Sequence, residues 1–343
     1  MTTAIAIVGY RNPDDVRQCL GALARSTDGA FTVHICENGG HAAARALVEA
    51  LAGRVAAAPA DQGEPAGGPL VWHGRLEPGG QTVRVLCPGE NLGYAGGVNT
   101  AIRDAMAGGR WDAVWVLNPD TEPAPDALAE MHRHLARGPY GMVGSRLVFR
   151  KTGRVQLYGG RWRPLIARGF NIGLNQPGDA TPDIAAVEAE TTYVNGASML
   201  VSRAFIEDVG LMDERYFLYN EEVDWCFRRG AHRLGYAHAA VVAHDHGSTI
   251  GSNTQRRQRS ALSVYLDERN KLLFSRRFFP RLYPVILLTT LVLTAQYLRH
   301  GAVRNFFVAL QGWFAGLRGE DGVPALARRP RPRPAEPATA ASR

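Results

Sequence analysis

The sequence of 343 residues contains few cysteines and no apolar run long enough to cross a membrane. Its four cysteines, Cys19, Cys36, Cys87 and Cys226, are scattered without a CxxC pair, which argues against a disulfide framework or a zinc site and fits a reducing cytosol. The amino-terminus has no basic stretch followed by an apolar one, so no signal peptide is predicted. The one candidate membrane segment, Pro284–Leu298, is shorter than the roughly 20 residues that a spanning helix needs, and we interpret it as interfacial.

Lysine is also nearly absent, occurring only as Lys151 and Lys271, so arginine supplies almost all of the positive charge. The net charge of +7 favours anionic partners such as nucleotide diphosphates, acidic lipids or nucleic acid. The arginines are not interleaved with aromatic residues on one predicted face, so we do not expect a nucleic-acid partner. Neither G-x-G-x-x-G nor a P-loop occurs. The loop Tyr10–Pro13 is also not the Gly- and basic-rich loop that a nucleotidyltransferase requires.

What the sequence does contain is an alternation of short apolar runs and helical patterns over its first 250 residues or so. This alternation predicts an α/β fold with a mostly parallel central sheet. We expect strands at Thr3–Val8, Phe31–Cys36, Val83–Cys87, Ala113–Leu117, Thr192–Val201 and Ala239–Ala243, and helices at Asp14–Ala24 and Ala124–Leu135. Residues 57–80 are rich in Gly, Pro and Ala and predict a surface loop or hairpin.

The character of the chain changes at Gln255, where helical periodicity and clusters of arginine begin. We therefore divide it into an α/β domain (residues 1–254), a helical region (255–320) and a disordered tail rich in Pro, Ala and Arg (321–343). The arginines flank the apolar segment and can bind an anionic membrane leaflet, each contributing about 1 kcal/mol. Alternatively, the region is a buried helical hairpin that packs on the α/β domain or on a second subunit.

The first polar cluster follows the strand expected at 113–117 and contains Asn118 and Asp120. In open α/β sheets, the loops after the strands line the ligand crevice. A carboxylate in such a loop can hold a hard divalent cation that also bridges two phosphates. Alternatively, Asp120 or Thr121 caps the following helix, and the sequence leaves both interpretations open.

The second cluster contains Glu221, Glu222 and Asp224 beside several aromatic residues. Crowded carboxylates raise the pKa of one another, and a carboxylate that faces a hydroxyl group can act as a general base. If this segment is helical, Glu221 and Asp224 share a face and Glu222 points elsewhere. Alternatively, the three acids favour a helix amino-terminus and pair with Arg228 and Arg229.

The third cluster, His244 and His246, follows the strand expected at 239–243. A neutral imidazole can ligate a divalent metal, and Asp245 could orient one of the rings. A purely structural role for either histidine is the alternative.

A loop between Glu90 and Asn99 carries glycines at positions 93, 96 and 97 before a helical pattern. Glycine lets the backbone approach a ligand closely, and a helix amino-terminus suits a diphosphate or a sugar ring. By itself this motif has little specificity.

In this order and spacing, the motifs resemble the inverting glycosyltransferases of family 2, which have the GT-A fold, and most of all their bacterial rhamnosyltransferase branch. The resemblance extends from Ala4 to about Pro280. It rests on the start of the first strand and on Glu37–Asn38, Asn91–Asn99, Leu117–Asp120, Val194–Leu200, Tyr216–Arg228, His244 and Arg269–Lys271.

The resemblance implies a catalytic site that binds Mg²⁺ or Mn²⁺. Asp120 corresponds to the acidic residue that bridges the cation to the donor diphosphate, and His244 to the histidine that completes the metal site, with His246 as its rival. Glu222 stands where the family usually has an aspartate as catalytic base. Because the side chain of glutamate is one methylene longer than that of aspartate, Asp224 or Glu221 could be the catalytic base instead.

The resemblance also implies a donor site. Tyr10 and Glu37 correspond to residues that grip the nucleotide base, although the family often has aspartate at the second position. Gly196 and Ala197 resemble the loop under the donor sugar and the acceptor. The other residues expected at the donor are Asn38, Asn91, Gly93, Asn99 and Asn118.

The implied activity is transfer of a sugar from a nucleotide-diphosphate donor to a hydroxyl of a glycan or a polyprenyl-linked acceptor in cell-envelope polysaccharide synthesis. By similarity, rhamnose is the expected donor sugar, and galactofuranose, hexose and N-acetylhexosamine are the alternatives. We expect a cytoplasmic protein, peripheral on the inner face of the plasma membrane and able to form a homodimer. The competing hypothesis is a sugar-nucleotide-binding protein of the same fold without transferase activity.

Overall fold

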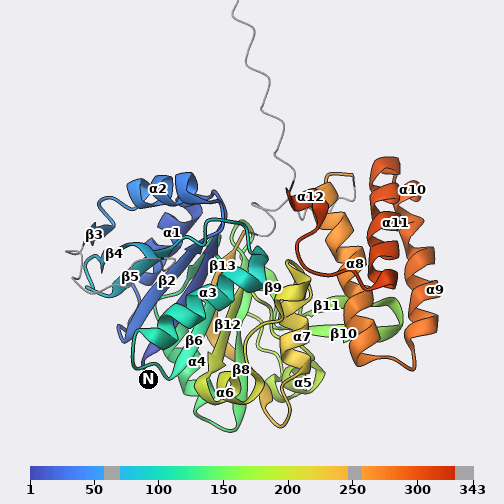
Figure 1. Ribbon diagram of the computed structural model, residues 1–343. Coiled ribbons are helices and arrows are strands. Elements are labelled where there is room, and N and C mark those ends of the chain that lie inside the picture. Colours follow the sequence, from blue (N-terminus) through green and yellow to red (C-terminus); the bar gives the residue numbers. More distant parts are fainter. Residues whose placement is uncertain (58–69, 246–256, 329–343) are drawn as a thin grey trace, which may run out of the picture.

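The computed structural model describes residues 1–57, 70–245 and 257–328, which form an α/β domain with a group of helices beside it (Figure 1). The strands of the main sheet are β1 (Thr3–Gly9), β2 (Phe31–Glu37), β3 (Val55–Ala57), β4 (Leu70–Leu76), β5 (Thr82–Leu86), β6 (Ala113–Leu117), β7 (Thr121–Pro123), β8 (Tyr140–Phe149), β9 (Val155–Leu157), β12 (Ser198–Ser202) and β13 (Arg233–His244). A separate hairpin consists of β10 (Gly159–Arg163) and β11 (Arg168–Ile172), joined by the short 3₁₀ turn Pro164–Ile166.

The helices of the α/β domain are α1 (Pro13–Leu23), α2 (His41–Ala50), α3 (Gly93–Ala107), α4 (Ala127–Leu135), α5 (Ile184–Glu190), α6 (Arg203–Val209) and α7 (Glu221–Phe227). The carboxy-terminal helices are α8 (Ala261–Phe278), α9 (Tyr283–Thr294), α10 (Gln296–Arg299), α11 (Val303–Arg318) and α12 (Ala325–Arg328). The last of these lies inside the segment predicted as a disordered tail.

The main sheet has the order β3-β4-β5-β2-β1-β6-β12-β8-β13-β7, and β9 pairs with β8. The α/β fold is confirmed, but the expectation of a mostly parallel sheet is wrong. The order β5-β2-β1-β6 is parallel, whereas β12 runs antiparallel to both of its neighbours. The direction of a strand depends on the connections between strands. The chain reverses direction at β9 and at the β10–β11 hairpin, and the apolar runs of single strands do not reveal these reversals.

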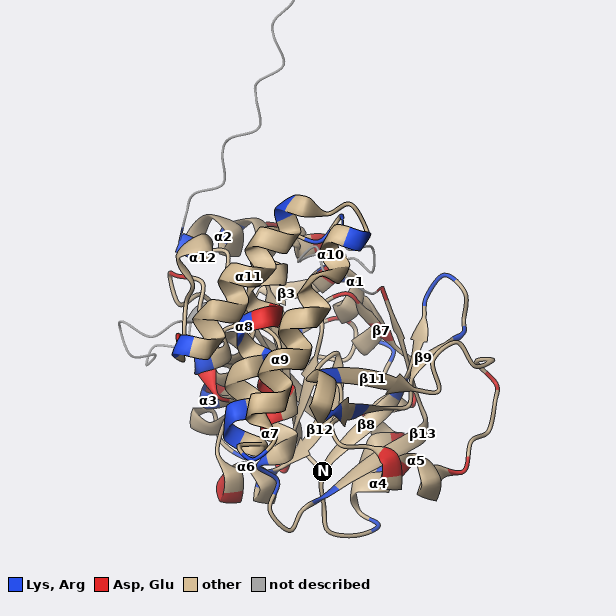
Figure 2. Ribbon diagram, turned by 90° about the vertical axis from the view of Figure 1, so that its right-hand side faces the viewer, with Lys and Arg blue, Asp and Glu red and all other residues tan. Residues whose placement is uncertain are grey.

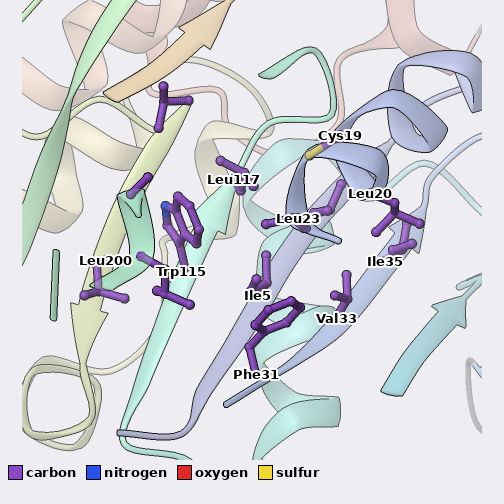
Figure 3. Packing of buried hydrophobic residues seen from close by; sticks show 14 of the residues in the cluster. Ile5, Cys19, Leu20, Leu23, Phe31, Val33, Ile35, Trp115, Leu117 and Leu200 are labelled. Atoms are coloured by element: carbon purple, nitrogen blue, oxygen red, sulfur yellow. The ribbon is translucent and has the colours of Figure 1, made fainter. Parts of the chain in front are cut away.

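Alternate residues of the strands pack on opposite faces of the sheet, as the pleat of a strand requires. Ile5 of β1 and Trp115 of β6 belong to a cluster that α1, α2 and α4 cover, and Figure 3 shows Leu20 and Leu23 of α1 packed over these strands. Their neighbours in sequence face a second cluster, which α3, α6, α7 and α8 cover. The loops that follow β1, β2 and β6 therefore open between two packed helical layers.

The carboxy-terminal helices continue the second cluster. Leu272 and Phe274 of α8 and Ile286 of α9 are buried in it. No helix among the described residues is long and apolar enough to cross a membrane. The boundary between residues 254 and 255 remains a prediction, and residues 329–343 of the expected tail lie outside the described part of the chain.

Two buried polar residues of α8, Arg269 and Asn270, fasten this helix to the loop before α7, and we refer to them as the α8 clamp. The amide nitrogen of Asn270 donates to the carbonyl oxygens of Tyr216, Leu218 and Tyr219 at 2.7–2.9 Å. The Arg269 guanidinium donates to the Tyr216 carbonyl at 3.0 Å. Asn270 is fully buried, so its loss would remove a hydrogen-bond donor from the carbonyls of Leu218 and Tyr219, whereas the Tyr216 carbonyl would keep Arg269.

Replacing Asn270 with alanine should lower the free energy of unfolding by about 1–3 kcal/mol, because it leaves buried carbonyls without a donor. Urea denaturation followed by circular dichroism measures the change. Asn171→Ala is the matched control, because Asn171 is exposed and donates one bond of 3.3 Å. An unchanged denaturation midpoint for N270A would contradict the role of the clamp.

Candidate active site

The site forms at the carboxyl ends of the parallel strands. The register pairs Gly9 of β1 with Glu37 of β2, and it pairs Ala6 with Val116 of β6. The loops after these three strands therefore emerge along one edge of the sheet, where ligands of open α/β sheets bind.

Asp120 and His244 meet at this edge because β7 pairs with β13. His244 is opposite Thr121 in the antiparallel register, which brings its Nε2 to 3.4 Å from Asp120 Oδ1. The Oε1 atom of buried Gln156 lies 2.9 Å from His244 Nδ1. Because a carbonyl oxygen accepts there, Nδ1 carries the proton and Nε2 presents its lone pair towards Asp120.

This donor set fits a divalent cation that is shared with a ligand. A carboxylate oxygen and a neutral imidazole nitrogen are both suitable ligands, and Mg²⁺ commonly uses one or two protein groups together with substrate phosphates. Among the described residues, no group of three or more His, Cys, Asp or Glu side chains could hold a metal alone. His246, the rival ligand, lies outside the described residues.

The competing interpretation of Asp120 and Thr121, as caps of the next helix, is wrong. The strand β7 (Thr121–Pro123) follows Asp120 directly, and α4 begins only at Ala127, with Asp126 at the N-cap position. The Thr121 hydroxyl donates to the Asn118 carbonyl at 2.6 Å and so closes the loop that presents Asp120.

The three acids of α7 occupy different environments. Glu221 and Asp224 share the buried face, as predicted for a helix, and Glu222 is half-buried. Asp224 accepts from Arg228 at 2.6 Å and from Arg277 at 2.8 Å. The alternative interpretation, pairing with nearby arginines, thus holds for Asp224, whose two carboxylate oxygens are both engaged.

Among the residues that the structure describes, the other two acids form no such ion pair. Burial, followed by the charge of Glu222, raises the pKa of Glu221 well above its ordinary value. Burial also raises the pKa of Glu222. In the described part of the chain, Glu221 Oε2 has no hydrogen-bond partner. Carboxyl groups with raised pKa values are characteristic of acid–base sites.

The loop that leads into α7 is strained. Phe217, Tyr219 and Asn220 all have positive φ values, between 64° and 74°, and each such conformation costs on the order of 1–3 kcal/mol in residues other than glycine. The α8 clamp holds the carbonyls of this loop from one side. From the other side, the Tyr94 amide donates to the Phe217 carbonyl at 2.6 Å. Strain held by surrounding contacts is a common feature of functional sites.

Gly93 makes this close approach possible. Its φ is +75°, and a Cβ at this position would lie 2.1 Å from the Phe217 carbonyl oxygen. Any side chain would therefore clash with the backbone of the strained loop. Gly93, which is predicted to lie at the donor, thus also approaches the loop that carries the acids.

Tyr94 connects the loop after β6 with the segment before β12. Its hydroxyl lies 2.9 Å from Asn118 Oδ1 and 2.8 Å from the Gly196 carbonyl oxygen. Burial, followed by the charges of Glu221, Glu222 and Asp120, raises the pKa of this hydroxyl well above its ordinary value. The carboxylates after β6 and at the start of α7 therefore surround one tyrosine.

Tyr10 and Glu37, the residues expected at the nucleotide base, lie at the ends of β1 and β2. The Oε1 atom of Glu37 accepts from the backbone amides of Arg11 at 3.0 Å and Gly39 at 2.7 Å. Its Oε2 is buried and, among the described residues, has no partner. Burial raises the pKa of this carboxyl group. Tyr10 is half-buried in the adjacent loop, with the Arg11 guanidinium 5.4 Å from its ring centre.

Several residues expected at the donor also hold the framework together, and their contact with a donor stays a prediction. Asn38 donates to the Gly93 carbonyl at 2.7 Å, and Asn91 accepts from the Gly93 amide at 2.9 Å. Buried Asn99 bonds both to the backbone of Met212 and to Glu214. The Ala197 carbonyl accepts from the Asn118 amide at 3.0 Å, which joins the loop after β6 to the segment before β12.

Sequence reasoning did not assign roles to Tyr94, Gln156, Tyr193 or the α8 clamp. Tyr94, Arg269 and Asn270 lie inside motifs that carried the family resemblance, so a signal existed for them. Gln156 lies in a segment without a clear pattern, and only the folded chain brings it to His244. Tyr193 lies in a segment predicted as a strand, a pattern that indicates no role for its hydroxyl.

The comparisons with known proteins agree with this geometry. Residues 74–198 match the family described as glycosyl transferase family 2. The chain is similar to the low-salt glycan biosynthesis hexosyltransferase Agl10 of Haloferax volcanii, at 26% identity over 71% of this chain and 78% of that protein. It is also similar to the N-acetylglucosaminyl-diphospho-decaprenol L-rhamnosyltransferase of Mycobacterium tuberculosis, at 29% identity over 49% of this chain and 61% of that protein.

Among solved structures, the crystal structure of GalNAc-T7 with UDP, GalNAc and Mn²⁺ matches with a TM-score of 0.52 at 12% identity. The match covers 78% of this chain and 48% of that one. At this identity the likeness concerns the fold alone, and it supports the expected GT-A-type architecture.

Replacing Glu221 with glutamine should make stability less dependent on pH. Because the folded-state pKa of Glu221 is raised, the folded state binds more protons than the unfolded state, and stability falls as the pH rises from the unfolded pKa through the folded one. The melting temperature of E221Q should therefore increasingly exceed that of the wild type between about pH 5 and pH 8. Glu49→Gln, on the exposed surface of α2, is the control. A difference independent of pH would contradict the raised pKa.

Proposed function

Because the chain belongs to the family 2 glycosyltransferases, we propose that it transfers a sugar from a nucleotide-diphosphate donor to a lipid-linked acceptor, with Glu222 as the general base and inversion at the anomeric carbon. The observation that carries this proposal is the grouping of Asp120, Glu221 and Glu222 around Tyr94, with His244 beside Asp120.

Glu222 is the proposed base because the three acids of α7 differ in their burial and in their ion-pair partners. Both carboxylate oxygens of Asp224 are engaged by arginines, Oδ1 by Arg228 and Oδ2 by Arg277, so neither oxygen is free to face an acceptor hydroxyl. Glu221 is the more deeply buried of the other two, so it retains its proton more readily. Glu222 then carries the negative charge of the pair and accepts the proton of the acceptor hydroxyl as that oxygen attacks the anomeric carbon.

The proposed metal ligands are Asp120 and His244, with Gln156 fixing the imidazole. Mg²⁺ or Mn²⁺ bound there would stabilise the negative charge that develops on the leaving nucleotide diphosphate. The structure of GalNAc-T7 in complex with UDP and Mn²⁺ supports this expectation. The strained loop and the α8 clamp hold α7 in place, so that little reorganisation is needed when the acceptor binds.

The proposed contact to the nucleotide base is Glu37. Its buried Oε2 atom is oriented beside Gly9, where a Cβ would lie only 2.6 Å away. A carboxylate oxygen in this position can accept a hydrogen bond from an N–H group of the base. The half-buried ring of Tyr10 offers a stacking surface next to it.

We propose rhamnose as the donor sugar and a polyprenyl-diphosphate-linked sugar as the acceptor class. The support is the similarity to a protein described as an N-acetylglucosaminyl-diphospho-decaprenol L-rhamnosyltransferase. The similar hexosyltransferase Agl10 keeps hexose donors as the competing choice.

We also propose that the carboxy-terminal helices contact an anionic membrane. Their exposed apolar side chains are Val285, Leu288 and Val292 of α9 and Val303, Phe307 and Phe314 of α11, which we refer to as the apolar face. Figure 2 views the molecule from this side, where α9 and α11 are mostly uncharged. The exposed arginines Arg281, Arg299 and Arg304 lie near the ends of these helices, as expected at an interface with acidic lipids.

Replacing Glu222 with glutamine should reduce kcat by at least about 100-fold, because loss of a general base typically costs 10²–10⁴-fold. Transfer from dTDP-rhamnose is measured as release of dTDP, and donor binding is measured by calorimetry with Mn²⁺. Binding should be unchanged.

The matched control is Glu221→Gln on the same helix, which should keep most of the activity. If E221Q loses activity and E222Q retains it, the assignment of the base is reversed. If wild-type protein binds donor sugars but transfers none of them, the proposed transfer is wrong.

A further inference from the structure

One face of the β10–β11 hairpin is positively charged and has no part in the mechanism above. Arg163 and Arg168 face each other across the two strands, an arrangement of like charges that is destabilising by itself. Both guanidinium groups lie over the ring of Phe170, at 4.1 Å and 5.9 Å from its centre. Within the described residues, neither forms an ion pair, whereas Arg161 on the same face pairs with Glu190 at 3.4 Å.

The opposite face of the hairpin packs on the core beside the proposed base. Trp162 is buried and contacts Phe274 of α8 edge-on, with ring centres 4.7 Å apart. A Cβ at Gly169 would lie 2.3 Å from the Tyr193 hydroxyl. Burial, followed by the charges of Glu222 and Cys226, raises the pKa of that hydroxyl. The hairpin is therefore anchored through Tyr193 next to Glu222.

The tip of the hairpin reaches the apolar face. The Thr289 hydroxyl of α9 donates to the Leu165 carbonyl at the tip, and the Leu165 side chain is 53% exposed. Figure 2 shows β11 beside α9. Arg163 and Arg168 flank this tip directly, so the arginine pair lies beside the exposed apolar residues of α9.

We propose that Arg163 and Arg168 bind the phosphate groups of the lipid-linked acceptor. Guanidinium groups bind phosphate oxygens through paired, charge-assisted hydrogen bonds, and a bound anion would relieve the repulsion between the two arginines. The lipid chain would then lie on the apolar face and the acceptor sugar would reach Glu222. This inference rests on the proposed function, because it assigns the acceptor subsite of the same active site.

Two sources of phosphate are compatible with an arginine pair at a membrane surface, namely the acceptor diphosphate and the headgroups of anionic lipids. The pair is compact, lies on a hairpin that Trp162 and Gly169 fix to the core, and flanks the tip that contacts α9. A fixed pair beside the apolar face favours one lipid-linked ligand, so we assign it to the acceptor.

The test uses a double variant in which Arg163→Gln and Arg168→Gln are combined. Its control is Arg161→Gln, which changes an ion-paired arginine of the same face. Transfer from dTDP-rhamnose is measured in detergent micelles to two acceptors, farnesyl-diphospho-N-acetylglucosamine and octyl N-acetylglucosaminide, which lacks phosphate. The double variant should raise KM for the diphosphate acceptor by about tenfold or more. The kcat value, the KM for the donor and the transfer to the phosphate-free acceptor should be unchanged, and R161Q should behave like the wild type.

A binding measurement separates this inference from the proposed function. Farnesyl diphosphate alone is titrated into the protein in neutral detergent, without donor. If no donor supports transfer but wild-type protein binds farnesyl diphosphate and the double variant does not, the subsite stands and the proposed function fails. If transfer occurs and the double variant keeps its KM for the diphosphate acceptor, the subsite is wrong.

Sedimentation with phosphatidylglycerol vesicles distinguishes the two sources of phosphate. The double variant should sediment like the wild type, whereas Leu288→Glu with Val292→Glu in the apolar face should not. Loss of sedimentation by the arginine variant, with an unchanged KM for the diphosphate acceptor, would assign the pair to membrane headgroups and overturn the proposal.

Discussion

The contact between Asp120 and His244 is the constraint on which the rest of the site depends. It exists because β7 pairs antiparallel with the end of β13, which brings together a loop after β6 and a residue more than a hundred positions later. Gln156 holds the imidazole in the orientation that faces the carboxylate. Tyr94 then relates this pair to the acids of α7, because its hydroxyl experiences the charges of both groups. The charges of Asp120, a proposed metal ligand, and of Glu222, the proposed base, thus act on one half-buried hydroxyl, with Glu37 at the carboxyl end of β2 on the same sheet edge.

The carboxy-terminal helices contribute to this site as well as covering the sheet. The α8 clamp bonds to the carbonyls of a loop with three residues at positive φ, and Arg277 of the same helix holds Asp224. The same group of helices exposes the apolar face. An enzyme that receives its acceptor from a membrane would gain from this connection, since α8, which holds the loop before Glu222, packs against α9 and α11, which carry the apolar face.

The sequence allowed the parallel strands β1, β2, β5 and β6 to be located, because each is a short apolar run bounded by turn residues. It also singled out Asp120, Glu222 and His244, since polar clusters after strands are a local signal, and the family resemblance it suggested is confirmed. The mixed direction of the sheet could not be predicted, because it depends on long-range pairing. The pairing of Asp224 with Arg277, 53 positions away, and the role of Gly93 against Phe217 likewise exist only in the folded chain.

The central claim is that Asp120 and His244 hold a divalent cation together with the donor diphosphate. Electron paramagnetic resonance of Mn²⁺, titrated with and without dTDP, measures this binding directly in the wild type, in Asp120→Asn and in the exposed control Asp126→Asn. The account predicts that dTDP strengthens Mn²⁺ binding in the wild type and in D126N, and that D120N weakens it by about tenfold or more. Binding of Mn²⁺ and dTDP by D120N with the affinity of the wild type would contradict it.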